Sequence, residues 1–250
     1  MIELKNGSAG YGKSMVLKDV SAAFEKGRLT GVIGVNGSGK STLLKAILAM
    51  IPISGGRIMI DGYPLDRMTR IGIARKAAYI AQGKSAPDMT VEQLVLHGRF
   101  PHLNYPRRYT GRDREIALAA MAQAGIAEHA RKPLRALSGG MRQNAYIAMA
   151  LAQGTDYILL DEPTTYLDIA RQLELMKTLK SLADHGKGIV CVMHDLPMAM
   201  NFSDRIVLLD EGRILIDDKP EQVCKQHIID SVFGVALERS ADGRTYSYRY

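Results

Sequence analysis

The sequence contains no tryptophan, few aromatic side chains and no apolar run long enough to cross a bilayer. Because a spanning helix needs about 20 consecutive apolar residues, we expect no membrane span. The sequence also has only two cysteines, Cys191 and Cys224, which fit no metal-ligand spacing. No signal-peptide apolar region follows Met1, so the sequence predicts a protein of the reducing cytoplasm.

Basic residues outnumber acidic ones, and the formal net charge is +7. This balance permits nucleic acid, anionic lipid headgroups or polyphosphate ligands as partners. Arginines gather locally at 107–108 and 112–114, but no long basic block exists. A solvated basic surface explains the charge equally well, so charge alone excludes none of these classes.

Residues 34–42 read Gly-Val-Asn-Gly-Ser-Gly-Lys-Ser-Thr. An apolar run over 29–35 precedes them and a helical pattern over 41–48 follows, which is the context of a phosphate-binding loop. The glycines let backbone N–H groups converge on one anion, and the helix N-terminus adds its positive dipole. The predicted nucleotide contacts are Gly34, Asn36, Gly37, Ser38, Gly39, Lys40, Ser41 and Thr42. Lys40 would reach the β- and γ-phosphates, so the sequence predicts a nucleoside triphosphate site.

Two acids end the apolar run over 157–160, which is typical of a buried parallel strand. Buried carboxylates need a partner. A Mg²⁺ ion held by Asp161 and the Ser41 hydroxyl would supply one. Glu162 then stands where it could orient and deprotonate an attacking water.

A second anion site is predicted at residues 137–141, Leu-Ser-Gly-Gly-Met. Ser138 suits a helix N-cap, and Gly139 and Gly140 leave their backbone N–H groups open. Two such helix ends in one chain suggest that each serves a different nucleotide across a dimer. A plain capped helix is the alternative reading of this motif taken alone.

The surrounding pattern predicts further elements. Thr90 and Gln93 form a capping box, and Asp113 is expected to cap a helix that runs to 124. Asp168 is expected to cap an amphipathic helix whose apolar stripe is predicted to be core packing. That stripe comprises Ile169, Leu173, Met176 and Leu179. The last 11 residues, 240–250, are expected to form a polar tail.

In their order and spacing, these motifs resemble the ATPase subunit of ATP-binding cassette (ABC) transporters over nearly all 250 residues. The resemblance implies an α/β fold with a RecA-like P-loop NTPase core, an antiparallel β subdomain and an inserted α-helical subdomain. The expected core with its β subdomain covers 1–84 and 155–220, and the expected helical subdomain covers 85–154. A short C-terminal helix and tail are expected over 221–250.

The resemblance also assigns roles that the residues alone leave open. Tyr11 would stack on adenine rather than serve as an ordinary turn tyrosine. Gln82 would bridge Mg²⁺ and a transmembrane permease, with residues 85–110 forming the receiving cleft. Asp168 would lie at the interface of an ATP-sandwich dimer of two copies. His194 would contact the γ-phosphate and hold the attacking water.

Two stretches, 161–172 and 97–102, resemble the ATPases of iron–siderophore, haem and cobalamin importers. They imply a subunit bound peripherally to the cytoplasmic face of the membrane and linked, through the permease, to a solute-binding protein. The alternative is a soluble cassette ATPase acting on nucleic acid or ribosomes. Such proteins usually carry two cassettes or a coiled-coil insertion, and this chain has neither, so nucleic acid is not the expected partner.

Overall fold

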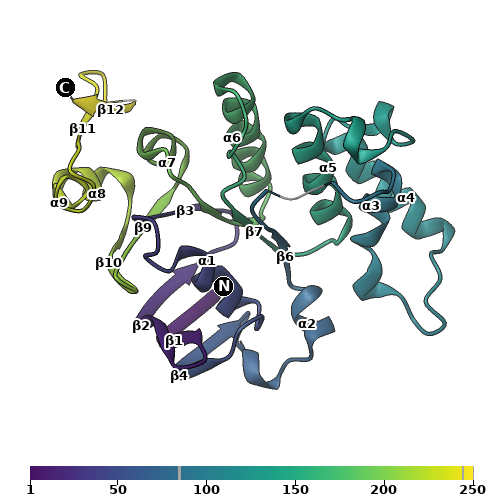
Figure 1. Cartoon of the computed structure of the whole chain (residues 1–250), viewed down its shortest axis with the longest axis horizontal. Coiled ribbons are helices and arrows are strands. Elements are labelled where there is room, and N and C mark those ends of the chain that lie inside the picture. The colour runs from purple at the N-terminus through teal and green to yellow at the C-terminus, as the bar shows by residue number, and fades with distance from the viewer. Residues whose placement is uncertain (84–85, 244, 250) are drawn as a thin grey trace.

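The computed structural model describes residues 1–83, 86–243 and 245–249. A six-stranded sheet with the order β10-β9-β3-β8-β7-β6 forms its centre (Figure 1). Its strands are β3 (Leu29–Ile33), β6 (Ala77–Ile80), β7 (Tyr157–Asp161), β8 (Gly188–Val192), β9 (Arg205–Asp210) and β10 (Arg213–Asp218). All neighbours in this sheet run parallel except β9 and β10. Every residue of β3, β7 and β8 is buried, as their continuous apolar runs predict.

A second, antiparallel sheet lies beside the first, with the order β2-β1-β4-β5. Its strands are β1 (Ile2–Tyr11), β2 (Ser14–Phe24), β4 (Ile53–Ile60) and β5 (Tyr63–Pro64). Helix α1 (Lys40–Ile47) packs between the two sheets and contributes to one shared apolar core. This core explains the fold's layers, because each sheet buries its apolar face against the same helix.

Helices α6 (Ile169–Asp184) and α7 (Leu196–Phe202) cover the opposite face of the central sheet (Figure 1). The predicted apolar stripe of α6 is only partly core, which corrects the prediction. Met176 and Leu179 are fully buried, but Ile169 is 75% exposed and Leu173 is 40% exposed. The first two turns of α6 therefore carry an apolar surface that this chain does not cover.

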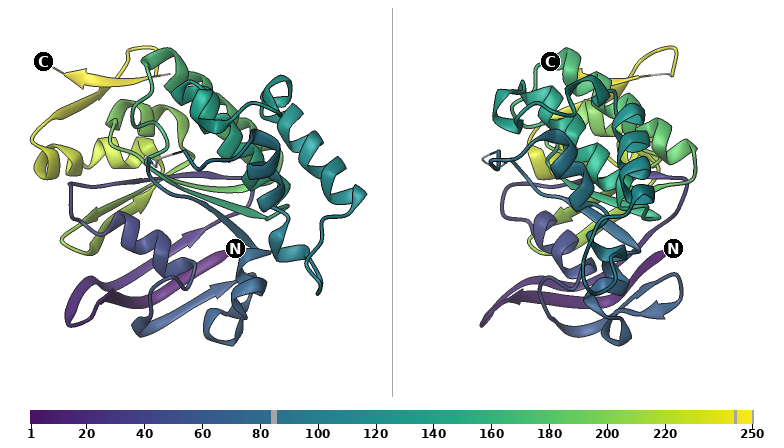
Figure 2. Two further views of the ribbon diagram at one scale, coloured as in Figure 1. Left: turned by 45° about the vertical axis from the view of Figure 1, so that its right-hand side comes forward. Right: turned by 90° about the vertical axis from the view of Figure 1, so that its right-hand side faces the viewer.

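The helical block comprises α3 (Val91–His97), α4 (Gly111–Gln123) and α5 (Gly139–Ala152), which pack against one another (Figure 2). The Thr90–Gln93 capping box of α3 is present as predicted. The N-cap of α4 is Thr110, and Asp113 is the third helical residue, whose carboxylate accepts a bond from the Thr110 backbone. The prediction that Asp113 caps this helix was wrong because the pattern of Asp followed by apolar residues also fits the third position of a capping box.

A short segment after α3 joins the helical block to the core. Arg99 donates to the Asp113 carboxylate at 3.0 Å and to the Ala152 carbonyl at 2.9 Å. His102 lies 2.8 Å from the Gln153 carbonyl, and the Pro101 carbonyl accepts from Arg75. Arg99 and His102, in the 97–102 segment that suggested an importer ATPase, thus bond groups of neighbouring elements, whereas His97 is exposed.

The described residues include several shorter elements. These are α2 (Arg70–Ala74), α8 (Pro220–Lys225), α9 (Ile228–Phe233) and the 3₁₀ turns Leu65–Arg67, Phe100–His102, Ala127–His129 and Leu134–Ala136. At the C-terminal end, β11 (Ala236–Arg239) pairs with β12 (Tyr246–Arg249), so the expected polar tail is in fact half of a hairpin. Asn201 of α7 anchors it, because its side chain bonds both backbone groups of Tyr246.

The predicted boundary between core and helical block, at residues 84 and 85, lies outside the described residues. Among the described residues, no helix is both long and apolar enough to traverse a bilayer.

Candidate nucleotide-binding site

Residues 34–39 turn the chain sharply between β3 and α1. A Cβ atom on Gly34 would lie 2.2 Å from the Leu209 carbonyl oxygen, so a larger residue would push the loop off the sheet. Gly39, the N-cap of α1, has φ of 107°, a conformation that favours glycine. The loop borders an open cavity of about 280 Å³, lined by Val16, Asn36, Gly37, Gly39, Lys40, Ser41, Thr42 and Glu162.

The Lys40 ammonium group is fixed inside this loop. Its Nζ donates to the carbonyl oxygens of Gly34 at 2.8 Å and Val35 at 2.9 Å. Burial lowers the pKa of Lys40, against the opposing attraction of Glu162 and Asp161. The side chain is 5% exposed, so its charge is held where an anion in the cavity would meet it with little screening by water.

The Asp161 carboxylate ends β7 directly beside the loop. Its Oδ1 accepts from the Ser41 hydroxyl at 2.9 Å, and its Oδ2 accepts from the Tyr79 hydroxyl at 3.0 Å. Burial and then the Asp161 charge raise the pKa of Tyr79 well above its usual range. Tyr79 is therefore a protonated donor throughout the physiological pH range.

Glu162 lies at the centre of a second polar cluster. Its Oε1 lies 2.6 Å from His194 Nε2, and its Oε2 accepts from the Gln82 amide. The Glu162 backbone has φ of 51°, which a non-glycine residue adopts at a cost in strain. The structure thus brings together the three side chains of the predicted catalytic group that follow strands β6, β7 and β8.

The Ser138 motif is built as predicted but stands apart from this cavity. The Ser138 hydroxyl accepts from the Met141 N–H at 3.3 Å and caps α5. Ser138 and Gly139 are exposed, and within the described part of the chain neither lines the loop cavity. In the described part of the chain, the Ser138 motif and the 34–42 loop therefore do not line one cavity.

Two other predicted nucleotide contacts, Tyr11 and Asp168, do not line the loop cavity in the described part of the chain. Tyr11 ends β1 and is 48% exposed, with Lys45 Nζ 6.0 Å from its ring centre. Asp168 caps α6 by accepting from the Arg171 N–H at 2.9 Å and is exposed. Their contacts with nucleotide stay predictions.

Sequence reasoning missed two residues of the site, Tyr79 and Val16. Tyr79 receives no site role from the sequence, although a tyrosine within an apolar strand needs a partner for its hydroxyl. Its partner could not be identified from the sequence, because the pairing of β6 with β7, which sets Tyr79 opposite Leu159, is known only from the structure. Val16 gave no signal beyond apolarity.

The oxygen donors at the loop fit Mg²⁺. Mg²⁺ is bound through one or two protein oxygens together with phosphates and water, and the Ser41 hydroxyl and Asp161 carboxylate lie side by side. Among the described positions there is no cluster of three or more His, Cys, Asp or Glu residues, which a protein-only metal cage would need. Gln82, the third predicted metal ligand, uses its amide nitrogen on Glu162 in this conformation.

A glycine-rich loop opening a helix, a buried lysine, and two acids at the end of a neighbouring parallel strand define a P-loop nucleoside triphosphatase. The family described as ABC transporter matches residues 17–165. The chain belongs to this family and is an ATP-binding subunit of it. The fold class and the resemblance inferred from the sequence are thereby confirmed, and the nucleic-acid alternative is not favoured.

Three comparisons place the chain within the family. It is 40% identical over 238 residues to an iron(3+)-hydroxamate import ATP-binding protein of Bacillus subtilis, covering 94% of this chain and 88% of that protein. It is 39% identical over 243 residues to a petrobactin import ATP-binding protein of Bacillus anthracis, covering 96% and 89%. A dimeric bacterial ABC transporter cassette superposes with a TM-score of 0.75 at 29% identity, covering 88% of this chain and 99% of that one.

Proposed function

We propose that this chain hydrolyses ATP to power an ABC importer of ferric siderophores, bound peripherally at the cytoplasmic face of the membrane. The similarity to hydroxamate and petrobactin import proteins along nearly the whole chain supports this cargo class over haem and cobalamin. Arg99 and His102 lie in the stretch that resembles importer ATPases, and both bond other parts of this chain. This stretch is therefore explained by packing within the chain and not by contact with the cargo.

The polar cluster on Glu162 carries the catalytic part of the proposal. Glu162 accepts the proton of a water that attacks the γ-phosphorus, while the bond to the β,γ-bridging oxygen breaks and ADP leaves. His194 and Gln82 hold the two carboxylate oxygens in place for this step. The Lys40 charge stabilises the negative charge on the transferring phosphoryl group. Mg²⁺, held by Ser41 and Asp161, would neutralise charge on the β- and γ-phosphates.

A second copy of the chain completes the site. Ser138 and Gly139 are exposed and Gly140 is half-buried, so the nucleotide on the 34–42 loop of one copy meets this motif of the other. The exposed Ile169 and Leu173 continue this surface next to Asp168. Covering them by a second copy would bury apolar area that a lone chain leaves in water.

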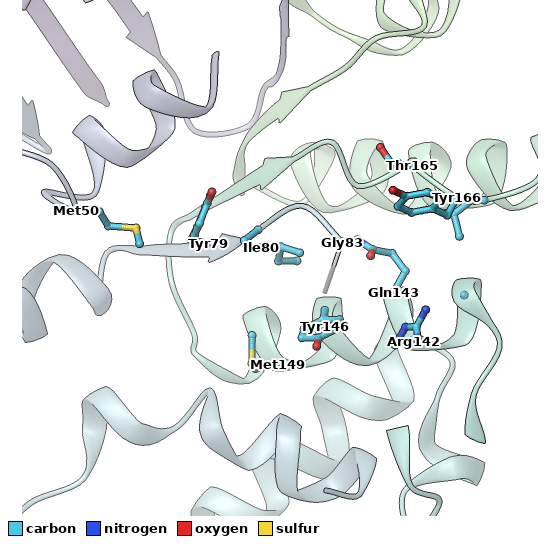
Figure 3. Close-up of a pocket in the computed structure, with 13 residues that line it drawn as sticks. Met50, Tyr79, Ile80, Gly83, Arg142, Gln143, Tyr146, Met149, Thr165 and Tyr166 are labelled. Carbon is cyan, nitrogen blue, oxygen red and sulfur yellow. The ribbon is translucent and has the colours of Figure 1, made fainter. Parts of the chain in front are cut away.

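The permease is proposed to dock beside Gln82, at a cavity that the described residues of the expected 85–110 cleft do not line. The cavity holds about 520 Å³ between β6 and α5, and its walls include Ala81, Gly83, Tyr146 and Met149. Figure 3 shows this space between the end of β6 and the helical block. Movement of the helical block against the core would change its shape, which would couple nucleotide state to the membrane partner.

Replacing Glu162 by glutamine tests the catalytic assignment. Glu162→Gln keeps the side-chain shape but removes the base, so turnover should fall by about 10²- to 10⁴-fold while ATP still binds. The matched control is Glu115→Gln, an exposed glutamate on α4, which should keep wild-type turnover. Wild-type turnover in the Glu162 variant would contradict the assignment.

The cargo is tested in cells whose own copy of this protein is removed. Uptake of a radioiron-labelled ferric hydroxamate should return with the wild-type chain and fail with the Glu162 variant. Restored uptake of cobalamin or haem instead would reassign the cargo. Nucleic acid retained on the purified chain, with no permease co-purifying from detergent extracts, would favour the soluble alternative.

A further inference from the structure

Tyr79 is the one side chain that borders both the Gln82 cavity and the Asp161 carboxylate in the described part of the chain. Its ring forms part of the wall of the 520 Å³ cavity. Its hydroxyl points away from Tyr146 and Met149 on the opposite wall (Figure 3) and bonds Asp161 Oδ2. The sequence pattern around Tyr79 does not predict a role for this residue in nucleotide chemistry.

We propose that Tyr79 is a positioning residue for the metal-binding carboxylate, holding Asp161 in the orientation that receives Mg²⁺ with bound nucleotide. The inference rests on the proposed Mg²⁺ site at Ser41 and Asp161, and not on the proposed cargo or permease.

The contacts of Asp161 support this role. The carboxylate is 4% exposed, so water does little to fix its rotamer. The described residues give it two hydrogen bonds, one on each oxygen, from Ser41 and Tyr79. Ser41 belongs to the loop and is itself expected to meet the metal. Tyr79 stands behind the carboxylate, where it can keep its bond whatever the loop binds.

Tyrosine is suited to this position because of its reach and stiffness. Tyr79 lies opposite Leu159 on the neighbouring parallel strand, two residues before the carboxylate. A rigid ring spans that offset, and the half-buried phenol loses little entropy on bonding. Outer-shell partners of ligating groups typically contribute about 10- to 100-fold to metal affinity.

The test is Tyr79→Phe, which removes the hydroxyl and keeps the ring in the cavity wall. The matched control is Tyr157→Phe, on the adjacent strand β7, which removes a hydroxyl that bonds another carboxylate, Asp61, at 2.8 Å. Both variants lose a buried phenol–carboxylate bond, so both report on stability. Of the two tyrosines, only Tyr79 bonds Asp161, the carboxylate beside the 34–42 loop.

The measured quantity is the dissociation constant of Mn²⁺, which serves as a metal probe and is monitored by electron paramagnetic resonance. The sample is the full chain loaded with ATP and carrying Glu162→Gln. Tyr79→Phe should raise this constant about 10-fold, and Tyr157→Phe should leave it unchanged. In chains with Glu162 intact, the Mg²⁺ concentration for half-maximal ATPase should rise in parallel, with KM for ATP at saturating Mg²⁺ unchanged.

An unchanged Mn²⁺ constant in Tyr79→Phe would overturn the proposal. So would equal shifts in both tyrosine variants, because a general loss of stability would then explain them. Either result leaves the ATPase and import assignments standing, while failure of siderophore uptake leaves the metal result standing.

Discussion

Met141 follows the Ser138–Gly140 motif and is the third residue of α5, the position where a glutamine could act as a capping partner. Glutamine there could return a hydrogen bond to the Ser138 N–H and complete a capping box. The structure gives the methionine a different use, since it is half-buried and packs against the larger apolar core. The groups expected to meet phosphate are unaffected by the exchange.

Met141→Gln therefore trades apolar packing for one hydrogen bond. The free energy of unfolding should change by less than about 1 kcal/mol, and the ATPase rate should change less than tenfold. Urea unfolding and steady-state turnover measure these two quantities. Met141→Leu, which keeps the packing without a capping group, is the control. A tenfold or larger gain in turnover with glutamine would mean that the native motif is impaired.

Tyr79 shows why some residues of the site cannot be predicted from the sequence. The loop at 34–42 can be identified because the glycines and lysine stand together in the chain. Tyr79 acts on Asp161, 82 residues away, through strand pairing. Only the strand order, which the sequence does not state, brings the two together.

The stability of helix α4 depends partly on contacts with residues outside the helix. The capping bonds from Thr110, together with the Arg99 guanidinium, lower the pKa of Asp113 from its usual 3.8 to about 2 against the opposing effect of burial. The folded state therefore favours the carboxylate. Its stabilisation is complete above about pH 4 and is lost as the pH falls toward 2.

Replacing Asp113 by asparagine should cost about 2 kcal/mol of unfolding free energy at pH 7, the equivalent of the pKa shift. The difference from wild type should narrow as the pH falls below about 4. Urea unfolding at a series of pH values measures it. Asp88→Asn, at an exposed ion pair with Arg135, should be nearly neutral throughout. A cost at Asp113 that stays constant down to the lowest pH would contradict this account.

The sequence predicted the buried strands well, because a continuous apolar run can be recognised without knowing which strand it pairs with. It placed Ile169 and Leu173 in the core wrongly, because helical periodicity shows which face is apolar but not whether anything covers it. The C-terminal hairpin was missed for a related reason. Its pairing depends on Asn201, which lies 45 residues before Tyr246.

At the scale of the whole molecule, the proposed function gives the chain two half-sites. The 34–42 loop, Glu162 and His194 follow the ends of the central strands β3, β7 and β8, while Ser138 is the N-cap of α5 in the helical block. Within the described residues the two groups do not line one cavity. A single copy should therefore bind ATP on the loop and hydrolyse it poorly.

The most direct test of this composite site is the mass of the Glu162→Gln chain in solution with saturating ATP and Mg²⁺, measured by sedimentation. The single chain has a mass of 27.4 kDa. The composite site predicts twice that mass with ATP, the single-chain mass without it, and the single-chain mass when Ser138→Arg is added. A Glu162→Gln chain that holds ATP and remains at 27.4 kDa would contradict the account.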